Sequence, residues 1–110
     1  MDESRALDGL SALGQESRLR IFRLLVKAGR EGVAAGSIAA SLGIVPNTLS
    51  THLDLLVRAG LVIRRRDGRA ILYAAHYPGI SGLLSFLMED CCGGRPELCA
   101  PALKTLACAC

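Results

Sequence analysis

The sequence predicts one mainly α-helical domain with a small β-hairpin, and two observations lead to this class. First, 110 residues with 51% hydrophobic content suffice for a single modest core. There is no Trp and there are only two Phe and two Tyr, so the core must be aliphatic, which suits helix-on-helix packing. Second, apolar residues recur mostly at helical spacing, while residues 61–75 form two β-rich runs around an Asp-Gly pair.

Two helices are expected before the first loop. Residues 4–13 carry leucines at steps of three, Leu7, Leu10 and Leu13, which fits a short amphipathic helix that completes the core or lies against a second subunit. Residues 16–28 combine a broad apolar face with basic side chains, and Gly29 ends that helix. Residues 30–35 are expected to form a loop.

A helix-turn-helix is expected next. A short helix over residues 36–43, with Ser37 as its N-cap, leads through a tight turn to a second helix that runs from Pro46 to Gly60. The second helix would enter the major groove of DNA. Taken alone, its polar start fits equally well a solvated helix end. The side chains that could reach base edges and phosphates are Asn47, Thr48, Ser50, Thr51 and His52.

A basic wing is predicted directly after the second helix. The Asp67-Gly68 pair between two β-rich runs is a strong hairpin signal. A hairpin in this position makes the fold a winged helix-turn-helix, with the order α-α-α-α-β-β-α. On a chain whose formal net charge is only +3, the wing gathers a cluster that would meet DNA phosphates or the minor groove: Arg64, Arg65, Arg66 and Arg69.

The last helix is expected over about residues 79–91 and is apolar on nearly all sides until Glu89 and Asp90. Such a helix must be covered, half by the core and half by a second subunit. A two-fold dimer presents two recognition helices to successive major grooves, so the expected partner is double-stranded operator DNA with an inverted repeat. His76, just before this helix, has no metal-ligand spacing and is expected to be structural.

Three segments resemble the ArsR/SmtB family of metal-responsive winged-helix repressors: residues 16–25, residues 47–62, and the Arg-rich wing around Asp67-Gly68-Arg69. The resemblance covers about residues 5–92. It implies a homodimer that pairs through the first and last helices and binds operator DNA until an ion releases it. It also implies a DNA-contacting role for His52.

Three thiols lie within nine residues after the last helix, at Cys91, Cys92 and Cys99. Adjacent cysteines have Cα atoms only about 3.8 Å apart, which strains a disulfide between them, so they are better placed to share an ion. Three thiolates without a convergent His or carboxylate suit a soft, three-coordinate centre. The expected effector is As(III), with Sb(III) as a second candidate.

Other uses of these cysteines remain open. A structural zinc ion needs a fourth ligand, from Cys108, Cys110 or the partner subunit, and a Cys92 to Cys99 disulfide would make a redox sensor. The family's better-known sites, cysteines around residues 36–43 or a His on the last helix, are missing here. The chain instead resembles members whose arsenic ligands include a vicinal cysteine pair at the end of the last helix. The terminal Cys108 and Cys110 remain accessory candidates.

The chain divides into residues 1–92, for DNA binding and dimerisation, and a cysteine-containing tail, 93–110, that completes the effector site. It has no secretory signal and no apolar run of membrane-spanning length, so we expect a cytoplasmic protein without membrane contact. Without Cys-x-x-Cys, a phosphate-binding loop or a Cys/His/acid set, an oxidoreductase or arsenate reductase is disfavoured, and no enzyme is expected. The expected function is arsenite-responsive repression. A redox-responsive or zinc- or cadmium-responsive repressor of the same fold is the alternative.

Overall fold

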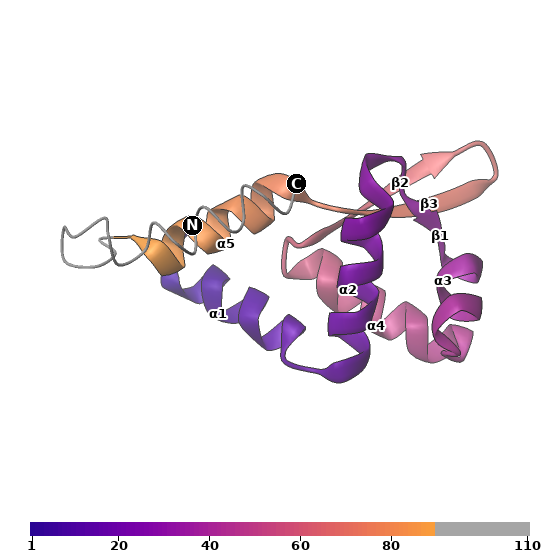
Figure 1. The fold of residues 1–110 in the computed structure, drawn as a ribbon, viewed down its shortest axis with the longest axis horizontal. Coiled ribbons are helices and arrows are strands. Elements are labelled where there is room, and N and C mark those ends of the chain that lie inside the picture. Colours follow the sequence, from indigo (N-terminus) through magenta and orange to yellow (C-terminus); the bar gives the residue numbers. More distant parts are fainter. Residues whose placement is uncertain (90–110) are drawn as a thin grey trace.

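The computed structural model describes residues 1–89, and this part of the chain folds as a winged helix-turn-helix (Figure 1). Five α-helices and a three-stranded antiparallel sheet make up these residues. The predicted fold class is therefore confirmed, and the predicted element order holds except for one additional short strand before the third helix. The elements are α1 (Glu3–Leu13), α2 (Glu16–Ala28), a 3-10 turn η1 (Gly29–Glu31), β1 (Val33–Ala34), α3 (Ala35–Leu42), α4 (Pro46–Arg58), β2 (Val62–Asp67), β3 (Ala70–Ala75) and α5 (Tyr77–Met88).

The core lies between α2, α3, α4 and the base of the sheet. On α4 the leucines at positions 49, 53 and 56 recur every three or four residues and are fully buried, as their spacing predicts. Full burial of an aliphatic side chain contributes about 1.5–3 kcal/mol. The largest fully buried side chains are Ile21, Leu25, Ile38, Leu49, Leu53, Leu56, Leu61 and Val62.

The turn between α3 and α4 follows the sequence closely. Gly43 adopts the left-handed conformation that ends α3, with φ of 65°, and Pro46 occupies the first turn of α4, where a missing N–H is harmless. The expected N-cap was wrong. The cap position of α3 is Ala34, which makes no side-chain cap bond, and Ser37 lies inside the helix with its side chain exposed.

Residues 30–35 are not a plain loop, as the sequence had suggested. They contain the end of η1 and the short strand β1, which pairs antiparallel with β3, so that the sheet order is β1-β3-β2. Gly32 permits this approach, because a Cβ at this position would lie 2.9 Å from the carbonyl oxygen of Tyr73 and its φ is +82°. A two-residue strand carries too little periodicity to be predicted.

The wing is the hairpin of β2 and β3. Asp67 pairs with Ala70, so the connecting residues are Gly68 and Arg69, one position later than the expected Asp-Gly turn. Gly68 supplies the positive φ that a tight hairpin turn requires. Only the base of the hairpin is buried, at Val62 on β2 and at residues 73–75 on β3.

The helices α1 and α5 lie side by side at the end of the molecule opposite the wing (Figure 1). Of the expected apolar stripe of α1, Leu7 and Leu10 face outward and are 59% and 42% exposed, while Leu13 packs against the core. The buried side of the helix is Ala6, Gly9 and Ala12. The helix α5 begins at Tyr77, two residues before the predicted Gly79. It ends at Met88, because Glu89 has an extended backbone with ψ of 132°.

The predicted end of this helix at Cys91, the division of the chain at residue 92 and all five cysteines lie outside the described residues. Among residues 1–89, no helix is long and apolar enough to cross a membrane.

Candidate nucleic-acid interface

The first turns of α4 present an exposed polar surface. The side chains of Asn47, Thr48, Ser50 and Thr51 are all exposed. Val45 makes no side-chain cap bond and Pro46 has no N–H, so the backbone N–H groups of the first turn point out of the helix without intrahelical partners. The Thr51 hydroxyl donates to the carbonyl oxygen of Asn47, at 3.3 Å, and keeps its lone pairs free to accept. This surface can bind phosphates and base edges.

His52 faces the protein rather than the open surface. It is half-buried, and Nη1 of Arg18 donates to its Nδ1 over 3.3 Å. Because guanidinium has no acceptor, Nδ1 must accept, so the ring is neutral and carries its proton on Nε2. Burial lowers the pKa of His52 below 6.5, and the adjacent Arg18 charge lowers it further. Only Nε2–H remains for the DNA contact expected of this residue.

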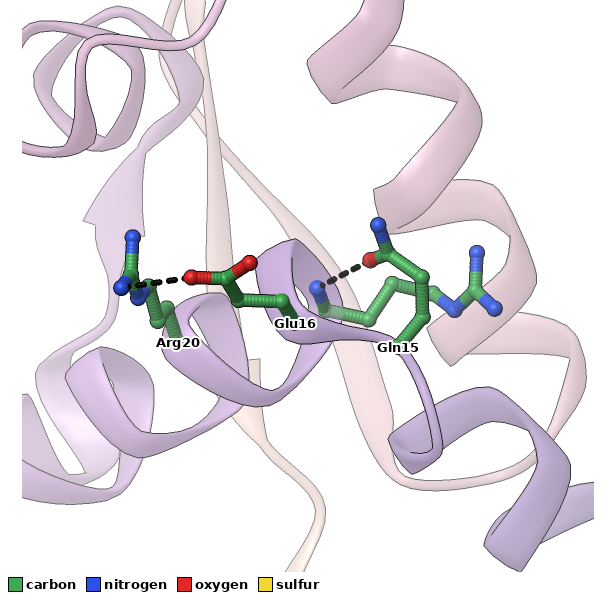
Figure 2. A network of polar contacts seen from close by, with 4 residues as sticks. Gln15, Glu16 and Arg20 are labelled. Carbon is green, nitrogen blue, oxygen red and sulfur yellow. Dashed lines mark hydrogen bonds and ion pairs between the residues drawn. The ribbon is translucent and has the colours of Figure 1, made fainter.

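Arg18 is itself fixed by the start of α2. The side chain of Gln15 accepts a hydrogen bond from the backbone N–H of Arg18 at 2.9 Å, and Glu16 pairs with Arg20 one turn later at 2.6 Å (Figure 2). The Nε of Arg18 donates to the carbonyl oxygen of Ala12 at the end of α1, over 2.6 Å. Arg18 therefore links the end of α1 to the recognition helix α4.

The four wing arginines divide into two pairs. Arg64 lies 3.8 Å from Asp54 of α4, in an ion pair whose side chains are both about half exposed. Arg65 donates to two backbone carbonyls of η1. Arg66 and Arg69 are exposed and have no polar partner among residues 1–89. Only this second pair has its full donor capacity free for phosphates.

The wing lies beside the recognition helix, where Arg64 approaches Asp54, so the two predicted DNA-contacting segments are on neighbouring elements. Arg18 and the η1 carbonyls were not expected to matter for this surface. Their partners lie 34 or 35 positions away in the chain, and no local spacing rule connects such pairs.

His76 is structural, as predicted. Its Nδ1–H donates to the carbonyl oxygen of Gly60 at 3.0 Å, which ties the start of α5 to the turn after α4. Within residues 1–89, no group of three His, Cys, Asp or Glu side chains could hold a metal ion. The candidate thiol site at Cys91, Cys92 and Cys99 lies outside these residues.

Residues 13–65 match the family model of a helix-turn-helix domain. The HTH-type transcriptional regulator Rv0081 of Mycobacterium tuberculosis, itself uncharacterized, is 39% identical over 73 residues, which cover 66% of this chain and 62% of the relative. A candidate arsenical resistance operon repressor of Halobacterium salinarum, ArsR2, is 36% identical over 62 residues, covering 56% and 51% of the two chains. The chain thus spans less than two thirds of the length of these curated relatives.

Solved structures extend the similarity over more of the chain. An ArsR-like transcriptional regulator from Rhodococcus sp. RHA1 superposes with a TM-score of 0.72 at 27% identity, covering 94% of this chain and 93% of that one. A candidate transcriptional regulator for arsenical resistance gives 0.64 at 30% identity, covering 73% and 80%. The homodimeric winged helix-turn-helix domain of Mb0332 from Mycobacterium bovis gives 0.65 at 28% identity, covering 77% and 76%. The chain belongs to the ArsR family of winged helix-turn-helix transcriptional regulators.

Proposed function

We propose that this protein is a cytoplasmic repressor that binds operator DNA as a homodimer and is released when As(III) binds Cys91, Cys92 and Cys99. The observation that carries the DNA-binding part is the polar, exposed start of α4 beside a wing whose Arg66 and Arg69 have no polar partner within residues 1–89. Base edges would be read from α4, and phosphates would be met by the wing.

Dimerisation is supported by the apolar surface at the opposite end of the molecule. Large apolar side chains of α1 and α5 are exposed there, and the M. bovis domain of similar fold is homodimeric. A two-fold axis through this surface would set two α4 helices against an operator with an inverted repeat. The exposed side chains are Leu7, Leu10, Leu84, Leu87 and Met88.

The effector part rests on the chemistry of the donor set. Three thiols follow Met88, the end of α5, within eleven residues, and three thiolates match the coordination of As(III), with Sb(III) as a second ligand of the same kind. Similarity to candidate repressors of arsenical resistance operons supports this choice. A coupling free energy of about 1–3 kcal/mol between the two sites would weaken operator affinity about 5- to 150-fold.

Titration of the reduced, DNA-bound protein with arsenite tests the proposal. The probe is a labelled duplex from the DNA upstream of the protein's own gene, followed by fluorescence anisotropy. We expect release from wild-type protein and none from the triple variant Cys91→Ser, Cys92→Ser, Cys99→Ser. The double variant Cys108→Ser, Cys110→Ser is the matched control and should respond as the wild type does. X-ray absorption of the arsenite-bound protein should count three sulfur ligands, and release from the triple variant would refute this site.

A thiol-redox switch is the second candidate, because Cys92 and Cys99 flank a Gly-Gly segment that permits a reversal of the chain. It predicts release by peroxide and no response to arsenite. A zinc or cadmium response would instead give four ligands in the absorption spectrum. Release by arsenite alone, with three sulfur ligands, excludes both.

A further inference from the structure

The outer part of the wing is not held by the core. Beyond Val62, every residue of β2 is exposed, as are Ala70 and Ile71 of β3. A hollow of about 240 Å³ also lies against the base of the hairpin, lined by Arg30, Ile63, Arg65 and residues 74–78. Apolar packing holds the base of the hairpin, at Val62 and residues 73–75, but not its outer part, whose direction polar contacts therefore help to fix.

Arg65 makes the strongest of these contacts. Its Nη1 donates to the carbonyl oxygen of Arg30 at 3.1 Å, and its Nη2 donates to the carbonyl oxygen of Glu31 at 2.6 Å. Arg65 is on β2, at one edge of the sheet, and it reaches past β3 to the turn that precedes β1 at the other edge. The bonds thus join the two outer margins of the three-stranded sheet.

The η1 turn presents two carbonyl oxygens to the Arg65 side chain. Gly29 begins the turn and Gly32 follows it, with φ of +79° and +82°, and the N–H of Gly32 donates to the carbonyl oxygen of Gly29. Within residues 1–89, the carbonyl oxygens of Arg30 and Glu31 accept no loop or turn hydrogen bond from a backbone N–H, and they accept instead from the two arms of the guanidinium. Hydrogen bonds from an ionised donor are roughly twice as strong as neutral ones, and a lysine cannot reproduce the planar fork.

We propose that Arg65 is a positioning residue that braces the wing against η1, while Arg66 and Arg69 make the phosphate contacts. The inference rests on the proposed DNA binding. The inference gives Arg65 a different role from the neighbouring arginines of the wing, which the sequence alone does not distinguish. The Arg64–Asp54 pair cannot replace the brace, because an exposed ion pair at 3.8 Å contributes little.

Charge-conserving variants of the full chain separate the two roles. Arg65→Lys keeps the charge and loses the fork, whereas Arg66→Lys is its matched control on the adjacent residue. In the DNA-free protein, we expect the amides of residues 63–72 to exchange hydrogen about tenfold faster in Arg65→Lys, as loss of a charge-assisted bond predicts. Arg66→Lys should exchange like the wild type.

Salt dependence supplies the second measurement, on a duplex of about 30 base pairs. Arg66→Gln should reduce the slope of log affinity against log salt by about one, as loss of one phosphate contact predicts. Arg65→Gln and Arg65→Lys should lower affinity about tenfold, because the wing must be ordered on binding, and should keep the wild-type slope.

Unchanged exchange in Arg65→Lys would overturn the brace, as would a drop in salt slope for Arg65→Gln equal to that of Arg66→Gln. Failure of the wild type to bind the duplex would overturn the proposed function and the DNA part of this inference. The exchange experiment would still decide whether Arg65 holds the wing.

Discussion

The helices α4 and α1 both carry leucines at helical spacing, yet they use them in opposite ways. Leu53 of α4 is 1% exposed, whereas Leu7 of α1 is 59% exposed. The helix α4 lies between α2, α3 and β2, and three of its leucines, at positions 49, 53 and 56, are buried there. The helix α1 approaches its neighbours through Ala6, Gly9 and Ala12, and a Cβ on Gly9 would already lie 3.5 Å from Leu83 of α5. The small residues of α1 thus allow α5 to approach closely, and Leu7 and Leu10 remain on the outer side of the helix.

Within residues 1–89, this difference divides the molecule into two halves. In the complete half, around α4, the large apolar side chains are buried within one chain. In the incomplete half, formed by α1 and α5, several large apolar side chains are exposed. Around α4, large side chains fill the interior. Across α1 and α5, Leu83 alone is a large buried residue, and Leu84 and Leu87 on the same helix are 43% and 50% exposed. Stability of the first half should not depend on protein concentration, whereas in the proposed dimer a second copy would bury the exposed side chains of the second half.

The largest expected effect is in the complete half. Leu53→Ala removes a fully buried side chain from the core and should lower the free energy of unfolding by about 2–5 kcal/mol. Urea unfolding followed by circular dichroism measures this loss. Leu7→Ala, at an exposed position, is the control and should change monomer stability by less than about 0.5 kcal/mol. Equal losses in the two variants would contradict the division into two halves.

A substitution at the contact between the two halves should have the next largest effect on the free energy of unfolding. A Cβ on Gly79 would overlap the carbonyl oxygen of Gly60, so Gly79→Ala must move α5 away from the turn after α4. We expect a loss of about 1–3 kcal/mol in unfolding free energy. Gly36→Ala is the matched control, because nothing lies within 4 Å of its added Cβ. Because Gly36 is the second residue of α3, in its first turn, the change should stabilise the protein by less than about 1 kcal/mol.

The sequence predicts the complete half better than the incomplete one, for physical reasons. In α4, the large apolar residues that recur at helical spacing are Leu49, Leu53 and Leu56, so the buried face follows from the spacing. In α1, leucines and small residues both recur every three positions. Which set is buried depends on how closely another helix approaches, and that is a tertiary property.

The candidate site divides in the same way. The polar start of α4 and the basic wing follow from local patterns, and the structure has both. The pairing of Arg18 with His52 and of Arg65 with two η1 carbonyls could not be predicted, because these partners lie 34 or 35 positions away in the chain. Carbonyl positions depend on turn geometry rather than on residue type. The sequence therefore showed an arginine cluster but not which members were already engaged.

Replacement of the exposed leucines of α1 by serine should weaken the proposed dimer. Leu7→Ser together with Leu10→Ser should raise the dimer dissociation constant at least about tenfold, because about 1.4 kcal/mol or more of apolar burial is lost. Sedimentation equilibrium measures the constant. Leu19→Ser is the control, since Leu19 of α2 is 45% exposed but belongs to neither helix. An unchanged constant in the double variant would place the dimer interface elsewhere.

The smallest expected effect is a pH dependence at the Arg18–His52 contact, where α2 meets α4. Burial first, and the Arg18 charge second, hold the pKa of His52 below 6.5 in the folded protein. The unfolded chain therefore takes up the proton at higher pH than the folded one does. The contribution of neutral His52 to the free energy of unfolding is fully present above pH 6.5, and it is lost as pH falls from there through the lower folded pKa.

Urea unfolding of the wild type and His52→Gln between about pH 8 and pH 5 isolates this contribution, because other titrating groups shift both proteins alike. The wild type should lose more stability than the variant below pH 6.5, and the two curves should run parallel above it. Two curves that run parallel from pH 8 to pH 5 would contradict a contribution of the Arg18–His52 contact to the pH dependence.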